Sequence, residues 1–259
     1  MAQSAIASTS KPVWVDLATN DAEGARRFYE GVFGWKVEVN SDRQYGGYGL
    51  AKLGGNDVAG IGPAQQPGQP PAWSLYVGTD DLSELSRRVE AAGGKVVAPA
   101  FDVGDQGRMA VFQDPSGAYL SAWQKTRMGG FQGRGPNTFG WAELNARGRD
   151  DTLPFYEQVF GWTARRSPMP GGTDYVEFQA GDETVAGASE LDPQVPAGTP
   201  NHWLVYFDVD DVRATFDKAI ELGGGEVMAP QSYPGGEFAI LTDPQGAAFG
   251  LFKSTGRQS

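Results

Sequence analysis

The chain contains one sequence pattern twice, and this repeat constrains its fold more than any other feature. The stretch Arg27-Phe-Tyr-Glu-Gly-Val-Phe-Gly-Trp35 returns 127 residues later as Pro154-Phe-Tyr-Glu-Gln-Val-Phe-Gly-Trp162. Two further matches follow in the same order, Trp73 with Trp203 and Asp114-Pro-Ser-Gly with Asp243-Pro-Gln-Gly. Three matches at nearly one offset predict two copies of one domain, because a period of this length is too long for a solenoid repeat.

Each copy divides again into two similar halves. In the first half, a strand over residues 13–18 precedes a helix that Asn20 or Asp21 can cap and that Gly34 ends. Three short strands follow, and the order then restarts with another strand and helix. The sequence therefore predicts an α+β fold of four βαβββ modules, over residues 12–63, 72–125, 138–190 and 201–253.

Composition limits the chemistry of this chain. Its 259 residues include no cysteine and one histidine, His202, which excludes thiolate nucleophiles, Cys-ligated metals and three-histidine zinc sites within one chain. The net charge of −11 argues against nucleic acid and anionic membrane surfaces as partners. No apolar run approaches the roughly 18 residues of a membrane span, and the N-terminus lacks the features of a secretory signal. We therefore expect a cytoplasmic protein.

The motifs together resemble the vicinal oxygen chelate superfamily, which includes glyoxalase I, bleomycin resistance proteins and extradiol dioxygenases. The resemblance rests on the Phe-Tyr … Phe-Gly-Trp, Asp-Asp-Leu … Ala-Ala-Gly-Gly and Asp-Pro-x-Gly motifs, and it looks greatest to two-domain actinobacterial proteins. It implies that each pair of modules forms a cupped mixed sheet that holds a ligand. We expect a disordered tail over 1–11, glyoxalase-like domains over 12–125 and 138–254, and a Gly-rich linker over 126–137.

In metal-dependent members of that superfamily, ligands come from the first strand of each module and from the last strand. The matching positions hold Trp14, Ser74 and Ser121 in the first copy, and Trp141, Leu204 and Gly250 in the second. None of these six is a good ligand for a hard or borderline divalent ion. We therefore expect no metal and no cofactor, with a divalent metal at low occupancy as the alternative.

Strand parity predicts which side chains would line each cup, because successive side chains point to opposite faces of a strand. One face, which carries Trp73 and Trp203, should lie under the helices, and the opposite face is here called the cup face. The ligand-binding residues predicted on the cup face are Trp14, Asp16, Tyr76, Tyr119 and Trp123 in the first copy, and Trp141, Glu143, His202, Tyr206 and Phe252 in the second. This mixture of aromatic and polar groups suits a planar or semi-polar organic molecule.

Asp16, Glu143 and His202 are the candidate acid–base residues of this set. Burial in a cup could raise the pKa of a carboxyl group, and His202 could form a pair with Glu143. Each also has a structural alternative: a carboxylate paired with arginine or backbone N–H groups, or a hydrogen-bonded structural histidine. Trp14 and Trp141 could simply fill the cups. The remaining repeated residues are expected to pack helices (Tyr29, Tyr156) or to form turns (Asp114, Asp243).

Two classes of function fit these residues, beside a structural module that binds nothing. The first is metal-independent binding of a small aromatic or amphiphilic molecule, such as an antibiotic or secondary metabolite, for sequestration, resistance or assistance to a biosynthetic pathway. The second is a glyoxalase-like lyase or isomerase, or a hydroxylase-type enzyme, that uses Glu143, Asp16 or His202. The acidic charge suits a cationic guest, and we expect a monomer or a homodimer.

Overall fold

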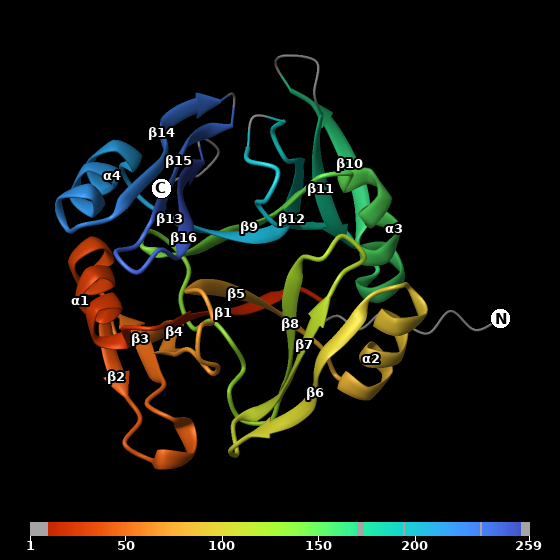
Figure 1. Cartoon of the computed structure of the whole chain (residues 1–259), viewed down its shortest axis with the longest axis horizontal. Coiled ribbons are helices and arrows are strands. Elements are labelled where there is room, and N and C mark those ends of the chain that lie inside the picture. Colours follow the sequence, from red (N-terminus) through yellow and green to blue (C-terminus); the bar gives the residue numbers. More distant parts are fainter. Residues whose placement is uncertain (1–9, 170–173, 194, 234, 255–259) are drawn as a thin grey trace. The chain divides into compact units, whose positions relative to one another are not determined.

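The computed structural model describes residues 10–169, 174–193, 195–233 and 235–254, and it confirms the four predicted βαβββ modules (Figure 1). The first module comprises β1 (Pro12–Thr19), α1 (Ala22–Phe33), β2 (Lys36–Val39), the short 3-10 helix η1 (Arg43–Tyr45), β3 (Gly49–Leu53) and β4 (Asn56–Pro63). The second comprises β5 (Ala72–Gly78), α2 (Leu82–Ala91), β6 (Lys95–Val103), β7 (Gly107–Gln113) and β8 (Tyr119–Lys125).

The second copy repeats this order of elements. Its third module comprises β9 (Thr138–Ala146), α3 (Arg149–Phe160), β10 (Thr163–Pro168), β11 (Asp174–Ala180) and β12 (Glu183–Glu190). Its fourth comprises β13 (His202–Asp208), α4 (Val212–Glu221), β14 (Gly225–Tyr233), β15 (Gly236–Thr242) and β16 (Ala248–Ser254).

Within the described residues, the strands form two mixed sheets of eight, one for each copy. Their orders are β2-β3-β4-β1-β5-β8-β7-β6 and β10-β11-β12-β9-β13-β16-β15-β14. In each module the last strand pairs in parallel with the first, as β4 does with β1, and the hairpin strands pair antiparallel. The α+β fold predicted from the repeat is therefore confirmed.

Local signals explain where α1 begins and ends. The Asp21 carboxylate accepts the N–H of Gly24 at 2.9 Å, which satisfies one of the free donors of the first turn. Gly34 adopts a φ of 73°, a left-handed conformation that suits glycine, and closes the helix. Between these ends, Phe28, Tyr29 and Val32 are buried at helical spacing.

One strand contains a proline. Pro99 lies within β6, although proline offers no N–H to a neighbouring strand. The structure continues β6 to Val103, and its pairing with β7 shifts register between Ala98 and Phe101. This irregularity accommodates the proline within the strand.

The helices pack by a different grouping from the sheets. One compact unit, unit one, contains the segment ending at Val13, Leu75–Gly129 and Ala142–Trp203, and in it α2 lies beside α3. The other, unit two, contains Trp14–Ser74, Gly130–Trp141 and the segment from Leu204 onward, and in it α1 lies beside α4 (Figure 1). Each unit thus combines helices from both copies, and the domain limits 12–125 and 138–254 stay a prediction.

Residues 1–9 of the expected tail lie outside the described residues. Its last two residues belong to the packing of unit one. The Ser10 carbonyl accepts the indole N–H of Trp162 at 2.7 Å, and the Lys11 carbonyl accepts the N–H of Gly78 at 2.9 Å. No helix within the described ranges is long and apolar enough to cross a membrane.

A candidate ligand-binding face

The ten predicted ligand-binding residues divide between the two units. Unit two holds Trp14, Asp16, Trp141, Tyr206 and Phe252, and unit one holds Tyr76, Tyr119, Trp123, Glu143 and His202.

In unit two, three cup-face side chains form a hydrogen-bonded series. The indole N–H of Trp14 donates to the Tyr48 hydroxyl at 3.0 Å, and that hydroxyl donates to Oδ2 of Asp16 at 3.3 Å. Burial, followed by the charge of Asp16, raises the pKa of Tyr48 well above its usual value. The phenol therefore stays protonated and can donate to the carboxylate while it accepts from the indole.

Glycine in β4 makes this arrangement possible. Gly60 lies opposite Asp16 in the pairing of β4 with β1. A Cβ atom on Gly60 would lie 1.8 Å from the Tyr48 hydroxyl oxygen and 2.9 Å from the Cβ of Asp16. The phenol ring of Tyr48 therefore lies over β4 at Gly60, where only glycine leaves room for it.

The segment between the copies covers Trp14. The Phe131 ring lies 5.7 Å from the Trp14 ring, centroid to centroid, and stacks on Phe139 at 4.8 Å. Gln132 anchors the segment, because its N–H donates to the Asp57 carbonyl at 3.0 Å and its side-chain oxygen accepts the Asp57 N–H at 3.3 Å. Trp14 is consequently only 4% exposed.

Sequence reasoning missed Tyr48, although the repeat contains a signal for it. Tyr175 follows Tyr48 by 127 residues, the offset that also separates Trp14 from Trp141. In β9 and β12, Glu143 lies opposite Gly187, in the register that Asp16 and Gly60 adopt in the first copy. Both copies therefore have a tyrosine and a glycine at matching positions near Asp16 or Glu143. This repetition could have identified the Trp14–Tyr48–Asp16 series from the sequence.

The predicted residues of unit one differ in exposure. Tyr76 and Trp123 are buried, and the indole N–H of Trp123 donates to the Met128 carbonyl at 2.8 Å. The Trp123 ring lies against Gly107, where a Cβ atom would approach it to 2.5 Å. Tyr119, at the start of the same strand, is 56% exposed.

His202 is held by the backbone just before it. Its Nδ1 lies 2.9 Å from the carbonyl oxygen of Pro200. A carbonyl only accepts hydrogen bonds, so Nδ1 is the donor in this contact. His202 and Glu143 both belong to unit one.

The positions where the resemblance implies metal ligands do not fit a metal ion. The Trp14 indole is engaged with Tyr48, and Ser121 and Leu204 are buried. At Gly250 a Cβ atom would lie 2.0 Å from the Tyr206 ring, so that ring occupies the space of a larger side chain. Within the described ranges, no three His, Asp or Glu side chains form a group that could hold a metal ion.

The opposite face of the sheet packs under the helices, as strand parity predicts. In unit two, Trp73 donates its indole N–H to the Tyr29 hydroxyl of α1 at 2.9 Å, and that hydroxyl lies 3.2 Å from Asp243. In unit one, Trp203 donates to Tyr156 at 3.0 Å, and Tyr156 donates to Asp114 at 2.6 Å; these are the same contacts with the copies exchanged.

The Tyr29 and Tyr156 hydroxyls stay protonated in these helix-side contacts. Burial, followed by the neighbouring carboxylates, raises the pKa values of Tyr29 and Tyr156 well above the usual value. Burial also raises the pKa of Asp243, against the opposing effect of backbone hydrogen bonds from Ala247 and Gln245. Both phenols therefore act as protonated donors in the core.

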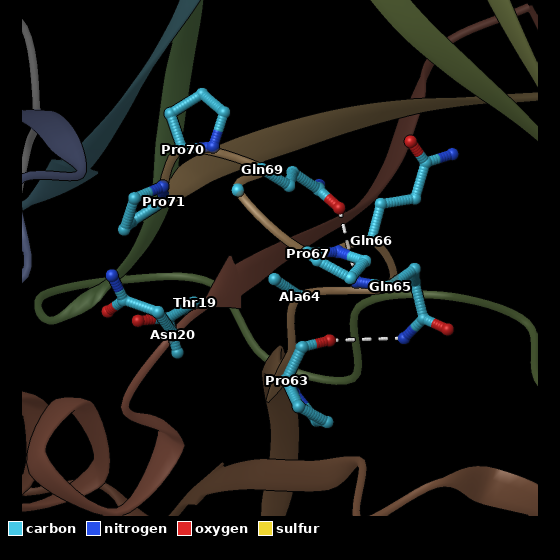
Figure 2. A pocket seen from close by; sticks show the side chains of 11 residues that line it. Thr19, Asn20, Pro63, Ala64, Gln65, Gln66, Pro67, Gln69, Pro70 and Pro71 are labelled. Carbon is cyan, nitrogen blue, oxygen red and sulfur yellow. Dashed lines mark hydrogen bonds between the residues drawn. The ribbon is translucent and has the colours of Figure 1, made fainter.

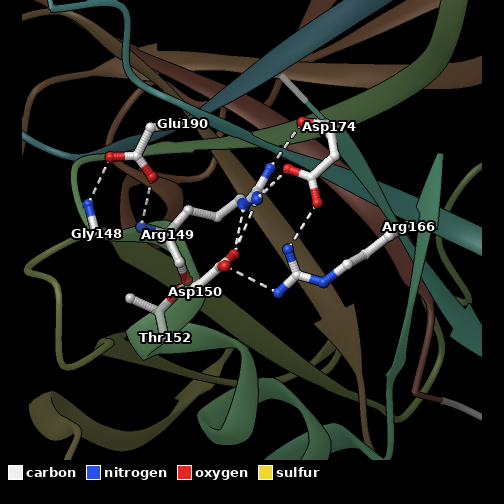
Figure 3. A network of polar contacts seen from close by, with 7 residues as sticks. All are labelled: Gly148, Arg149, Asp150, Thr152, Arg166, Asp174 and Glu190. Atoms are coloured by element: carbon white, nitrogen blue, oxygen red, sulfur yellow. Dashed lines mark hydrogen bonds and ion pairs between the residues drawn. The ribbon is translucent and has the colours of Figure 1, made fainter. Parts of the chain in front are cut away.

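A second polar cluster, in unit one, stabilises the fold at the start of α3 (Figure 3). The Arg149 side chain, 4% exposed, bonds Asp150 at 2.9 Å and Asp174 at 2.6 Å, and Arg166 bonds the same two carboxylates. Hydrogen bonds from Arg149 and Arg166 lower the pKa of Asp174 to about 2. The Glu190 carboxylate accepts the N–H groups of Gly148 and Arg149, in place of a cap within the helix.

Comparison with known proteins shows which family and which proteins the sequence is similar to. The family model described as "Glyoxalase/Bleomycin resistance protein/Dioxygenase superfamily" matches residues 11–121 and 138–251. The chain is 42% identical over 253 residues to "Putative glyoxylase CFP32" of Mycobacterium tuberculosis, covering 95% of this chain and 96% of that protein. It is 39% identical over 255 residues to "Anthracycline biosynthesis protein DnrV" of Streptomyces peucetius, covering 93% and 92%.

The fold is also similar to that of a solved structure. The Mn(II)-bound glyoxalase from Novosphingobium aromaticivorans aligns with a TM-score of 0.65 at 16% identity, covering 95% of this chain and 82% of that one. At this identity the similarity concerns the fold alone.

Proposed function

The chain belongs to the glyoxalase/bleomycin resistance protein/dioxygenase superfamily, and we propose that it binds a planar aromatic organic molecule on the cup face of β1 without a metal ion. The observation that carries this proposal is the series Trp14–Tyr48–Asp16. An indole offers a flat surface for stacking, and the adjoining phenol and carboxylate can orient polar groups on the guest.

Phe131 suggests how such a guest would bind. Its ring already packs on Trp14, so a planar ligand would replace one aromatic contact with another. The segment that carries Phe131 is held through Gln132 and Asp57, and it would have to move for the exchange. The linker thus acts as a cover of the site.

Two further observations support the choice of ligand. A relative at 39% identity is named an anthracycline biosynthesis protein, and anthracyclines are planar polycyclic compounds. The net charge of −11 favours the approach of a cationic member of that class. Six positions, among them Trp14 and Gly250, match the metal-ligand positions of the superfamily. The residues there are poor metal ligands, which supports binding without a metal ion.

Calorimetric titration with doxorubicin, a cationic anthracycline, tests the proposal. We expect the full chain to bind it equally well before and after dialysis against EDTA. Trp14→Ala should weaken binding about tenfold or more, as removal of a central tryptophan does at other binding sites. Phe131→Ala should strengthen binding about two- to tenfold, because an aromatic contact that competes with the ligand is lost.

Tyr119→Ala is the matched control, because it removes an exposed aromatic ring from the predicted set. It should leave affinity unchanged. Trp73→Ala should instead destabilise the fold by about 3–5 kcal/mol, since Trp73 packs under α1. Unchanged affinity in a folded Trp14→Ala protein, or loss of binding after EDTA treatment, would refute the proposal.

A glyoxalase-like activity is the second candidate function. It is supported by the 42% identity to the CFP32 protein and by the presence of His202 and Glu143 in the same unit. The assay is turnover of the methylglyoxal–glutathione hemithioacetal, with His202→Gln and Glu143→Gln as variants. Turnover that both variants lose while doxorubicin binding is retained would establish the activity, and a rate no higher than the uncatalysed one would reject it.

A further inference from the structure

The loops that join the modules of each copy begin in the same way. After β4, the N–H of Ala64 donates to the Thr19 carbonyl at 2.7 Å. After β12, the N–H of Leu191 donates to the Ala146 carbonyl at 3.1 Å. Thr19 and Ala146 are 127 residues apart, so the two loops start from equivalent places.

In the second copy, the loop closes around a guanidinium group. Nη1 of Arg147 donates to the Thr199 carbonyl at 2.6 Å. Nη2 of the same side chain donates to the carbonyls of Pro196 at 2.8 Å and Val195 at 3.1 Å. The backbone N–H of Arg147 donates to Asn201 at 2.9 Å. One guanidinium thus satisfies three carbonyl oxygens of the loop.

In the first copy, Asn20 occupies the position of Arg147. The shorter side chain cannot reach as far as arginine, and the loop here borders a pocket of about 640 Å³ (Figure 2). The pocket is lined by Thr19, Asn20 and residues 63–71. Its volume lies within the range of small-molecule sites, roughly 300–1,000 Å³.

Backbone N–H donors are missing from part of the pocket lining. Four of its residues, Pro63, Pro67, Pro70 and Pro71, have a backbone carbonyl but no N–H. The Gln65 side-chain amide donates to the Pro63 carbonyl at 3.1 Å, which shows that one of these carbonyls accepts from a side-chain donor (Figure 2). A guanidinium group carries five N–H donors and no acceptor, so it complements lining residues that offer a carbonyl and no N–H.

We propose that this pocket binds an organic cation carrying a guanidinium group, in the role that Arg147 has within the second copy. The proline rings would pack against the apolar part of the molecule, and the loop carbonyls would accept from its N–H groups. The net charge of −11 adds a general attraction. This site is separate from the residues of the Trp14 series, and it stands whether or not that series binds a ligand.

Calorimetric titration of the full chain with phenylguanidine, beside neutral phenylurea, tests this site. We expect phenylguanidine to bind about tenfold more tightly than phenylurea, because charge-assisted hydrogen bonds are the stronger kind. Asn20→Arg should abolish binding, since it supplies the side chain that the second copy already uses. Ser41→Arg adds the same charge at an exposed residue outside the pocket lining, and it should retain binding within about twofold.

Gln66→Glu gives a second measurement that does not depend on filling the pocket. Gln66 is an exposed lining residue, and a carboxylate of nearly the same shape should tighten phenylguanidine binding severalfold. Equal affinities for phenylguanidine and phenylurea would overturn the proposal. Unchanged binding in a folded Asn20→Arg protein, or no tightening by Gln66→Glu, would overturn it as well.

Discussion

The hydroxyl oxygen of Tyr29 lies 3.2 Å from Oδ2 of Asp243, a residue 214 positions further along the chain. The other oxygen of Asp243 accepts backbone N–H groups of its own turn, from Gln245 and Ala247. Tyr156 and Asp114 form the equivalent pair at 2.6 Å. Each buried phenol therefore joins a helix of one copy to a turn of the other.

Replacement of these phenols tests how much the joins contribute. Tyr29→Phe and Tyr156→Phe should each cost about 1–3 kcal/mol, because a buried carboxylate oxygen and an indole N–H lose a partner. The measurement is the free energy of unfolding in urea. Tyr119→Phe, at a residue 56% exposed, is the control and should change stability by less than about 0.5 kcal/mol. A Tyr29→Phe protein as stable as this control would contradict the account.

Separation of the copies is a second prediction. A chain of residues 1–128 contains helices α1 and α2, whose packing partners α4 and α3 lie in residues 129–259. We expect either part alone to aggregate or self-associate, and the two expressed together to form a one-to-one complex. Size-exclusion chromatography with light scattering measures the outcome. The prediction fails if either part is a monomer that unfolds cooperatively.

The acid stability of the protein should depend on Asp174. Its folded pKa, about 2, lies below the ordinary value of 3.8. A carboxyl group shifted in this direction stabilises the fold above its unfolded pKa, and this contribution disappears as the pH falls towards the folded value. Urea midpoints should therefore fall between about pH 5 and pH 2. Asp174→Asn should make that part of the profile flatter, and an identical profile would argue against the assignment.

Gly250 provides a packing prediction. A Cβ atom there would lie 2.0 Å from the Tyr206 ring, so Gly250→Ala should force the ring to move and cost about 1–3 kcal/mol. In a Tyr206→Ala background the same substitution should cost almost nothing. This double-mutant cycle in urea isolates the contact. Equal costs in the two backgrounds would show that the ring does not occupy the space.

The modules could be predicted from the sequence because their signals are local. Asp21 and Gly34 limit α1 within one short stretch, and the 127-residue repeat confirms the pattern. The partner of Tyr29 could not be predicted. No local property of the sequence indicates whether its hydroxyl contacts Asp114 of its own copy or Asp243 of the other copy. Tyr29 packs α1 and Asp243 forms a turn, as the sequence indicates. The hydrogen bond between the two residues could not be predicted from either property.

The candidate site was predictable only in part for a similar reason. Parity places Trp14 and Asp16 on one face, and the structure adds Tyr48 from a neighbouring strand. Phe131 belongs to a Gly-rich segment whose composition indicates a connection between copies. Its packing on Trp14 depends on where that segment runs, which is a property of the tertiary structure.

Under the proposed function, the position of Phe131 makes the connection between the copies a tethered competitor for Trp14. A side chain on a short tether is present at an effective concentration in the millimolar range, whatever the amount of protein in solution. A molecule that packs on Trp14 in its place must reach that concentration multiplied by the ratio of its own dissociation constant to that of the tethered ring. Insertions between Gln132 and Asn137 would therefore retune the apparent affinity of the face while every residue that touches the guest stayed the same.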